Sequence, residues 1–327
     1  MKVCIDCGGF CCFYLKRTEK SHSQFPNSWV FSKSLMSKIL DIFKPLYAPY
    51  FRKIGLLKSK IEIQSEGLVR FISYEHEIHQ PPLTGFNSEK LRIVFIIPDF
   101  HIGAGGHMTI FNIVHYLETF GHEVHLLIQN PSEHMTAKDA KEAINTYFQP
   151  FSGEVYLFEQ NLPDIEGDAL IATDRFTCYP AKAMGKFIRK FYLVQDYEPY
   201  FYPVGSEYLL TEETYNFDFD CLCAGEWLSQ IVANDYGRWS VAWPLAYDRS
   251  IYNVTETQNT QRHTNRIAFY ARYVTPRRAV ELCFLALKIL HSRGVAFEVD
   301  FFGWDIGKLR VDFPYINHGI LDAQALA

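Results

Sequence analysis

Residues 92–114 read RIVFIIPDFHIGAGGHMTIFNIV, and this stretch decides the fold class. The apolar run RIVFII predicts a buried strand, and the glycines of GAGG predict a tight turn. The apolar spacing of MTIFNIV predicts a helix directly after the turn. A strand, a glycine-rich turn and a helix in this order are typical of the nucleotide-binding unit of α/β folds.

The glycine turn departs from the best-known nucleotide motifs. Gly103, Gly105 and Gly106 are present, but Met108 stands where a dinucleotide-binding turn has its last glycine. The second strand ends LLIQN, so it lacks the carboxylate expected for NAD, FAD or S-adenosylmethionine, and the lysine of a P-loop is missing. Two interpretations remain: a turn whose free N–H groups bind an anion or a sugar, and a turn without a ligand.

Composition indicates a folded protein that is long enough for two domains. The chain has 327 residues, of which 48% are hydrophobic and 21% are charged, and its net charge is −5. Residues 1–90 are nevertheless basic, because they hold 13 Lys and Arg against 8 Asp and Glu. A basic front segment on an acidic body argues against nucleic acid as a partner, because in a nucleic-acid-binding protein the main fold would carry the basic surface.

Cysteine usage indicates a reducing compartment. Half of the eight cysteines lie in the first twelve residues, as Cys4, Cys7, Cys11 and Cys12, and no spaced disulfide framework follows. This cluster lacks a second CxxC pair, so we expect no metal site. The sequence has no signal-peptide pattern and no apolar run long enough for a membrane span. We therefore expect a cytoplasmic protein.

Residues 1–88 form a separate, basic and partly helical segment in this interpretation. Within it, residues 31–60 place apolar side chains on one helical stripe, with Lys33, Lys38 and Lys44 among the polar positions. Two interpretations stay open: a helix packed on the main body, and an interfacial anchor that makes the protein peripheral at the inner face of the membrane.

The rest of the chain alternates between short apolar strands and helices, which predicts parallel sheets covered on both faces. The first series occupies residues 89–253, the polar stretch 254–265 reads as a linker, and a second series occupies residues 266–327. The sequence therefore predicts two Rossmann-like, doubly wound domains. Expected strands are residues 92–97, 122–128, 154–158, 168–173, 190–195, 219–225, 266–271, 297–303 and 315–320, and the main expected helices are residues 108–120, 136–148, 226–236 and 278–294.

Four stretches together resemble glycosyltransferase family 4 of the GT-B fold, and within it the rhamnosyltransferase-like branch. They are FHIGAGGH (100–107), YLVQDYEPYFYPVGSEY (192–208), WPLAYDRSIY (243–252) and FYARYVTPRRAVEL (269–282). In the third stretch, Asp248 and Tyr252 match an aspartate and a later aromatic residue of the family. The resemblance implies a metal-independent hexosyltransferase that uses no cofactor besides its nucleotide-sugar substrate, with dTDP-rhamnose as one candidate.

The donor-binding residues suggested by this resemblance are Arg272, Arg277 and Arg278. Guanidinium groups offer forked donors that match phosphate oxygens, so they suit a departing diphosphate. The alternative, arginines merely on a surface, is less attractive because cations at a helix start oppose the helix dipole.

The acidic candidates follow a strand in VQDYEP. Asp196 is the first choice for orienting sugar hydroxyls or taking a proton from the acceptor, and Glu198 is the second. The alternative is that these acids cap the loop that follows. Asp174 and Arg175, which follow another strand, are weaker candidates. His107 belongs to the glycine loop of the expected cleft, although a solvated loop histidine is the simpler interpretation.

The aromatic residues near these acids have two interpretations as well. Tyr197, Tyr200, Phe201 and Tyr202 either stack on a sugar face or pack within the protein.

The second domain is expected to be incomplete, because the family's paired-glutamate segment is missing after residue 319. The predicted function is transfer of a sugar, with rhamnose as a candidate, to a polysaccharide or a lipid-linked glycan. The alternative is a non-catalytic carbohydrate- or nucleotide-binding remnant of such an enzyme.

Overall fold

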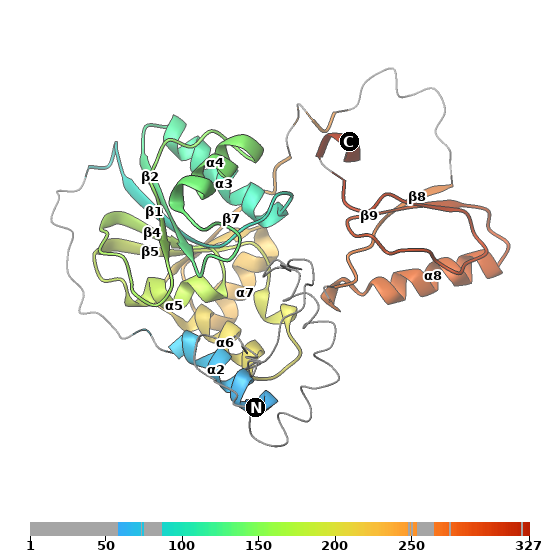
Figure 1. The fold of residues 1–327 in the computed structure, drawn as a ribbon, viewed down its shortest axis with the longest axis horizontal. Coiled ribbons are helices and arrows are strands. Elements are labelled where there is room, and N and C mark those ends of the chain that lie inside the picture. Colours follow the sequence, from blue (N-terminus) through green and yellow to red (C-terminus); the bar gives the residue numbers. More distant parts are fainter. Residues whose placement is uncertain are drawn as a thin grey trace, which may run out of the picture. The chain divides into compact units, whose positions relative to one another are not determined.

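The computed structural model describes residues 58–72, 74, 87–247, 249, 251–253, 265–274, 276–321 and 323–327 (Figure 1). The basic stretch 31–60 lies almost wholly outside the described residues, as do the four N-terminal cysteines, the matched Asp248 and most of the expected linker. The chain divides into two units, residues 1–64 and 65–327, and every element below belongs to the second except helix α2 (Lys60–Ile72), which begins in the first.

A seven-stranded parallel sheet forms the larger part of the described chain. Its order is β3-β2-β1-β4-β5-β6-β7, so the chain winds outward in both directions from β1. The strands are β1 (Arg92–Pro98), β2 (Glu123–Gln129), β3 (Val155–Phe158), β4 (Gly167–Ala172), β5 (Phe187–Val194), β6 (Asp220–Ala224) and β7 (Ser240–Trp243). This is the doubly wound order of Rossmann-like folds, in which ligands bind beyond the carboxyl ends of the strands.

Helices cover both faces of this sheet (Figure 1). Helices α3 (Gly105–Thr119) and α4 (Ala137–Tyr147) pack on one face, where Phe111 and Ile144 meet Phe95 in one buried cluster. Helices α5 (Arg175–Ala183) and α7 (Glu226–Tyr236) pack on the other face. Strands buried on both sides explain why RIVFII is apolar at consecutive positions rather than at alternate ones.

Shorter elements complete this part of the chain. They are the 3-10 turns η1 (Glu198–Phe201) and η2 (Thr214–Asn216), and helix α6 (Ser206–Glu213) between them. All three lie in the connection from β5 to β6, so this connection carries the VQDYEP segment that the sequence singles out.

A second, three-stranded parallel sheet has the order β10-β9-β8. Its elements are β8 (Arg266–Tyr270), η4 (Pro276–Arg278), α8 (Val280–Ser292), β9 (Glu298–Phe302), β10 (Tyr315–Asn317) and α9 (Ala323–Leu326). Phe269, Phe301 and Leu287 form its core with α8. The prediction of two parallel α/β sheets is confirmed. Helix α8 begins later than predicted because Ala279 adopts a left-handed conformation at φ 47°.

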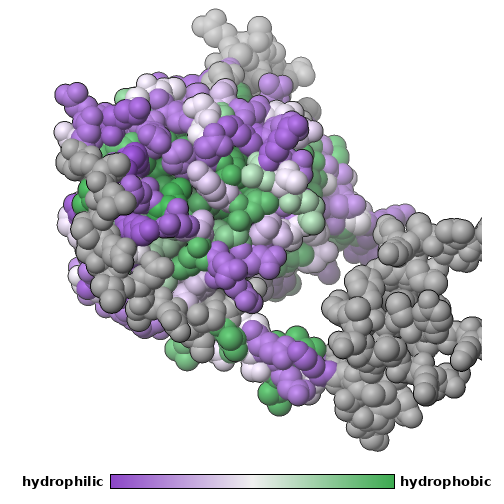
Figure 2. Space-filling view, turned by 60° about the vertical axis from the view of Figure 1, so that its left-hand side comes forward, coloured by the Kyte–Doolittle hydropathy of each residue, from purple (hydrophilic) through white to green (hydrophobic). Residues whose placement is uncertain are grey.

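Helix α2 (Lys60–Ile72) was not predicted. Its Leu68 packs against the core beneath the first sheet, and the Tyr74 hydroxyl just beyond it donates to the Glu159 carbonyl at 3.1 Å. None of the helices in the described ranges is long and apolar enough to cross a membrane. Figure 2 shows hydrophilic side chains over much of the visible described surface, with hydrophobic ones gathered between them.

Candidate functional site

The glycine turn leads from β1 into a helix whose N-terminus has no side-chain cap. Gly103 adopts φ 84°, a conformation that glycine reaches without strain. The N-cap residue is Ala104, which has no side chain that can accept from the first turn of α3. Helices α4 and α5 differ, because Thr136 and Asp174 cap them. Among the described residues, no side chain accepts from the first N–H groups of α3, as in anion-binding helix starts.

The glycine turn lies beside the VQDYEP segment. A Cβ atom placed on Gly106 would lie 3.7 Å from Oε1 and 3.8 Å from Nε2 of Gln195. Gln195 follows β5 directly, while Gly106 follows β1, and β4 lies between these two strands. The first two segments singled out in the sequence therefore meet at the carboxyl edge of the sheet.

Asp196 and Arg277 form an ion pair. The Arg277 Nη2 atom lies 2.5 Å from Oδ2 of Asp196, and its guanidinium carbon lies 4.5 Å from the ring centroid of Phe201. Burial lowers the pKa of Arg277, and the positive charges of Arg278 and Arg272 lower it further, while Asp196 acts in the opposite direction. The structure thus brings together the first-choice acid and the predicted donor-binding arginines, at close electrostatic range.

Glu198 lies inside the protein rather than on the rim of the site. Only 3% of the residue is exposed, and its Oε2 accepts the Arg175 backbone N–H at 2.8 Å. Burial raises the pKa of Glu198 to about 8, the negative charge of Asp174 raises it, and Arg175 lowers it. Burial also raises the pKa of Asp174, which caps α5. Of the two predicted catalytic acids, Glu198 is therefore enclosed by protein and bonded to the start of α5, whereas Asp196 is part-exposed.

A set of stacked tyrosines supports the segment that carries Asp196. The ring of Tyr197 stacks on that of Tyr215, with centroids 5.6 Å apart and planes 8° apart. The Tyr215 hydroxyl donates to the Asp196 carbonyl and accepts from the Glu198 N–H, both at 3.3 Å. The Tyr197 and Tyr236 hydroxyls lie 2.6 Å apart. Tyr197 therefore packs within the protein, and this packing fixes the backbone on both sides of it.

His107 is turned inward. Its Nε2 atom lies 3.2 Å from the Pro98 carbonyl oxygen, and its ring packs near Phe100. Burial lowers the pKa of His107, although the bond to Pro98 opposes this effect. The neutral imidazole thus braces the turn against the end of β1, and a solvated loop histidine is not what the structure has.

Asp99 is a structural residue of this edge that sequence reasoning missed. Its carboxylate accepts backbone N–H groups of Ser132 and Glu133, at 2.7 and 2.6 Å, and lies 2.7 Å from Nδ1 of His134. Burial alone raises the pKa of Asp99, but these hydrogen bonds outweigh burial and lower the pKa to about 2. Asp99 therefore ties the loop after β2 to the end of β1. An acid two residues after a predicted strand was the available signal.

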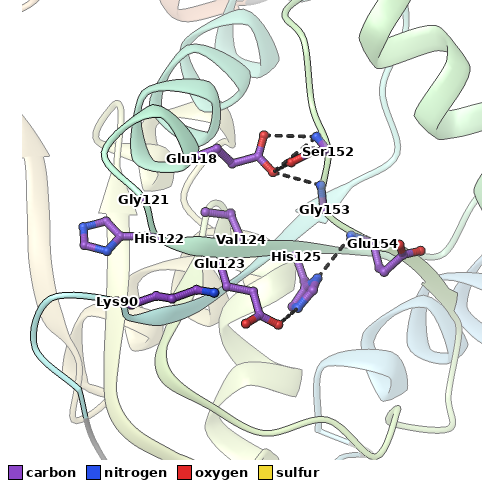
Figure 3. Close-up of a pocket in the computed structure, with 10 residues that line it drawn as sticks. All are labelled: Lys90, Glu118, Gly121, His122, Glu123, Val124, His125, Ser152, Gly153 and Glu154. Atoms are coloured by element: carbon purple, nitrogen blue, oxygen red, sulfur yellow. Dashed lines mark hydrogen bonds and ion pairs between the residues drawn. The ribbon is translucent and has the colours of Figure 1, made fainter.

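A surface pocket of about 350 Å³ lies elsewhere, at the amino ends of β2 and β3 (Figure 3). Its polar groups bond to one another: Glu118 accepts from the backbone of Ser152 and Gly153, and His125 lies 3.0 Å from Glu123. None of the predicted site residues lines it. In the part of the chain that is described, no group of three or more His, Cys, Asp or Glu side chains is placed to hold a metal ion.

No family profile matches the chain, and no curated protein matches it. Among solved structures, the chain is similar to an alpha-glucosyltransferase (AGT) in complex with UDP, at 13% identity and a TM-score of 0.34, over 66% of this chain and 59% of that one. It is also similar to an alpha-glucosyltransferase in complex with UDP and a 13-mer DNA containing a central A:G mismatch, at 13% identity and a TM-score of 0.30, over 71% and 67% of the two chains.

The chain thus spans 59% of the length of the first of these structures. The fold is therefore assigned from the strand order of this chain and not from these similar structures. The resemblance to the rhamnosyltransferase branch of family 4 stays a prediction.

Proposed function

We propose that this chain is a glycosyltransferase of the GT-B type, or part of one, that takes a sugar from a nucleotide donor. The observation that carries this proposal is the ion pair of Asp196 and Arg277, with Arg272 and Arg278 close enough to lower the pKa of Arg277. A carboxylate beyond the carboxyl end of β5 and guanidinium groups beyond the carboxyl end of β8 suit a substrate that combines hydroxyls with a diphosphate.

The arginines supply the electrostatic part of the proposed reaction. Negative charge grows on the diphosphate as the bond to the sugar breaks, and fixed cations lower the energy of that state. Arg277 offers forked donors that match phosphate oxygens without a metal ion. The uncapped start of α3 adds oriented N–H groups beside Gln195, which suit a phosphate oxygen or a sugar hydroxyl.

Asp196 supplies the acceptor part of the reaction. When the donor diphosphate binds the Arg277 guanidinium, the ion pair with Asp196 breaks. The free Asp196 carboxylate then accepts a hydrogen bond from a hydroxyl of the acceptor glycan. Such a carboxylate orients the hydroxyl and takes up its proton as the new glycosidic bond forms. Glu198 remains a buried positioning group in this scheme.

Calorimetric titration with UDP-, dTDP- and GDP-sugars tests donor binding. The wild type is expected to bind at least one of them, and Arg277→Ala is expected to weaken binding by tenfold or more, since a charge-assisted hydrogen bond contributes about 1.5–3 kcal/mol. Arg293→Ala is the matched control, because Arg293 is exposed at the end of α8. Equal affinities of the two variants would refute the donor site.

Transfer is tested separately, by mass spectrometry of a neutral oligosaccharide incubated with the bound donor. A mass increase of one hexose or deoxyhexose supports the enzyme, and the donor series decides whether rhamnose is the sugar. Donor binding without transfer would favour the non-catalytic remnant, and no binding to any nucleotide sugar would reject both.

We also propose that the acceptor is a polysaccharide or a lipid-linked glycan at the cytoplasmic face of a membrane. The support is the basic stretch 31–60, which lies almost wholly outside the described residues. Sedimentation with anionic vesicles is expected to weaken when Lys33, Lys38 and Lys44 are all replaced by glutamate. Unchanged sedimentation of this variant would remove the membrane contact without affecting the donor site.

A further inference from the structure

Two exposed aromatic side chains, Tyr200 and Trp227, contact Tyr197, the residue after Asp196. Tyr200 and Trp227 are each 56% exposed, although both belong to ordered elements, η1 and the first turn of α7. They follow β5 and β6, which are hydrogen-bonded neighbours in the sheet. Both therefore lie at the carboxyl edge, in the segments next to Asp196.

Buried neighbours hold these two rings in place. The ring of Tyr197 lies edge-on to both, with centroids 4.7 Å from Tyr200 and 6.5 Å from Trp227. Tyr197 is itself fixed by its stack on Tyr215 and by its hydroxyl contact with Tyr236. Aromatic faces held open to solvent on a rigid support bury ligand surface with little loss of side-chain freedom.

The polar groups near these rings are acids, an amide and the Arg277 guanidinium, which is paired with Asp196 and lies 4.5 Å from the ring centroid of Phe201. Asp196 and Gln195 precede Tyr200, and the exposed Glu226 precedes Trp227. A sugar ring presents C–H groups on its face and hydroxyls around its edge, so aromatic rings bordered by carboxylates and an amide match both surfaces. The exposed Glu226 beside Trp227 disfavours an anionic sugar at that ring, because like charges repel, while Arg277 is already paired with Asp196. The complementary occupant is therefore a neutral sugar.

We propose that Tyr200 and Trp227 form a stacking subsite for a neutral sugar ring of the acceptor glycan. This inference rests on the proposed glycosyltransferase function and assigns the acceptor side of the same site. Trp227 does not belong to the donor-binding set, so its loss is expected to leave nucleotide-sugar binding intact.

The test is calorimetric titration of the 327-residue chain with maltotriose, cellotriose and a neutral rhamnose trisaccharide, with trigalacturonate as the anionic comparison. The variants are Trp227→Ala, Trp227→Phe and Tyr200→Ala. Trp239→Ala is the matched control, because Trp239 is also 56% exposed but precedes β7, at the opposite, amino edge of the sheet. Far-ultraviolet circular dichroism verifies that each variant is folded.

The expected result is binding of at least one neutral trisaccharide, weakened about tenfold by Trp227→Ala and Tyr200→Ala and largely retained by Trp227→Phe. Trp239→Ala is expected to bind as the wild type does. Equal effects of Trp227→Ala and Trp239→Ala, preference for trigalacturonate, or no trisaccharide binding would each overturn the subsite. The same samples are also titrated with nucleotide sugars. Nucleotide-sugar binding without trisaccharide binding rejects the stacking subsite alone, whereas loss of both rejects the proposed function as well.

Discussion

Replacing Glu198 with glutamine is expected to stabilise the protein relative to the wild type, by an amount that grows with pH. Glutamine keeps an oxygen that accepts the Arg175 backbone N–H, so the main hydrogen bond of the buried carboxyl survives. What the substitution removes is a charge that burial and Asp174 disfavour more than Arg175 favours it.

The size of the effect follows from the pKa of Glu198, which burial raises from 4.5 to about 8. Between these two pH values the folded protein holds a proton that the unfolded chain has released. The free energy of unfolding therefore falls as pH rises, by about 1.4 kcal/mol per pH unit for one such group. Glutamine does not titrate, so the difference between variant and wild type reaches about 3 kcal/mol between pH 5 and pH 8.

Urea unfolding, followed by circular dichroism at pH 5, 6, 7 and 8, measures this difference directly. Titrating groups that both proteins share contribute equally to the two free energies of unfolding, so they cancel in the difference. What remains is the contribution of Glu198 and its coupling to Asp174. Glu207→Gln is the control, because Glu207 is exposed on α6. A constant difference between Glu198→Gln and wild type across this range, or a difference that shrinks with pH, would refute the reasoning.

The other predictions concern three further positions. Asp99→Asn is expected to cost about 2 kcal/mol of stability at pH 7, because the wild-type advantage of a carboxylate with its pKa lowered to about 2 persists until the pH falls below about 4; thermal unfolding at pH 7 and pH 3 checks this. Gly106→Ala is expected to keep nucleotide-sugar affinity, since its Cβ would make ordinary contact with Gln195, whereas Gly106→Leu is expected to displace that side chain and weaken binding in calorimetry. Gly153→Ala is expected to cost about 3 kcal/mol or more in urea unfolding, because its Cβ would fall 1.7 Å from the Val124 carbonyl oxygen; an unchanged midpoint would contradict this.

The fold was predictable because strands of a parallel sheet are buried on both faces and are therefore apolar at consecutive positions. Each expected strand of the first domain is an apolar run long enough to be recognised, and each run became a strand. Strand β7 escaped prediction because its four residues, SVAW, are too few for a pattern. Helix α2 escaped because its pattern, KIEIQSEGLVRFI, is weakly apolar and only part of it meets the core.

The site was predictable in outline but not in the role of each residue. The sequence singles out the segments of Asp196 and Arg277 separately, and the structure pairs the two side chains. The burial of Glu198 had no local signal, because it depends on Arg175 and Tyr215, which are remote in sequence. The role of Asp99 likewise depends on a loop more than thirty residues away. Long-range contacts of this kind leave no periodicity in a single sequence.

The tyrosine stack beneath Asp196 has a practical consequence for all of these measurements. Tyr197, Tyr215 and Tyr192 are buried, and their rings lie nearly parallel in two consecutive pairs. Chromophores fixed in this way in an asymmetric interior give circular dichroism in the near ultraviolet, which vanishes when tertiary packing is lost. The native chain thus carries an intrinsic optical reporter under its candidate carboxylate, and the order of that loop can be followed without a label and before any substrate is known.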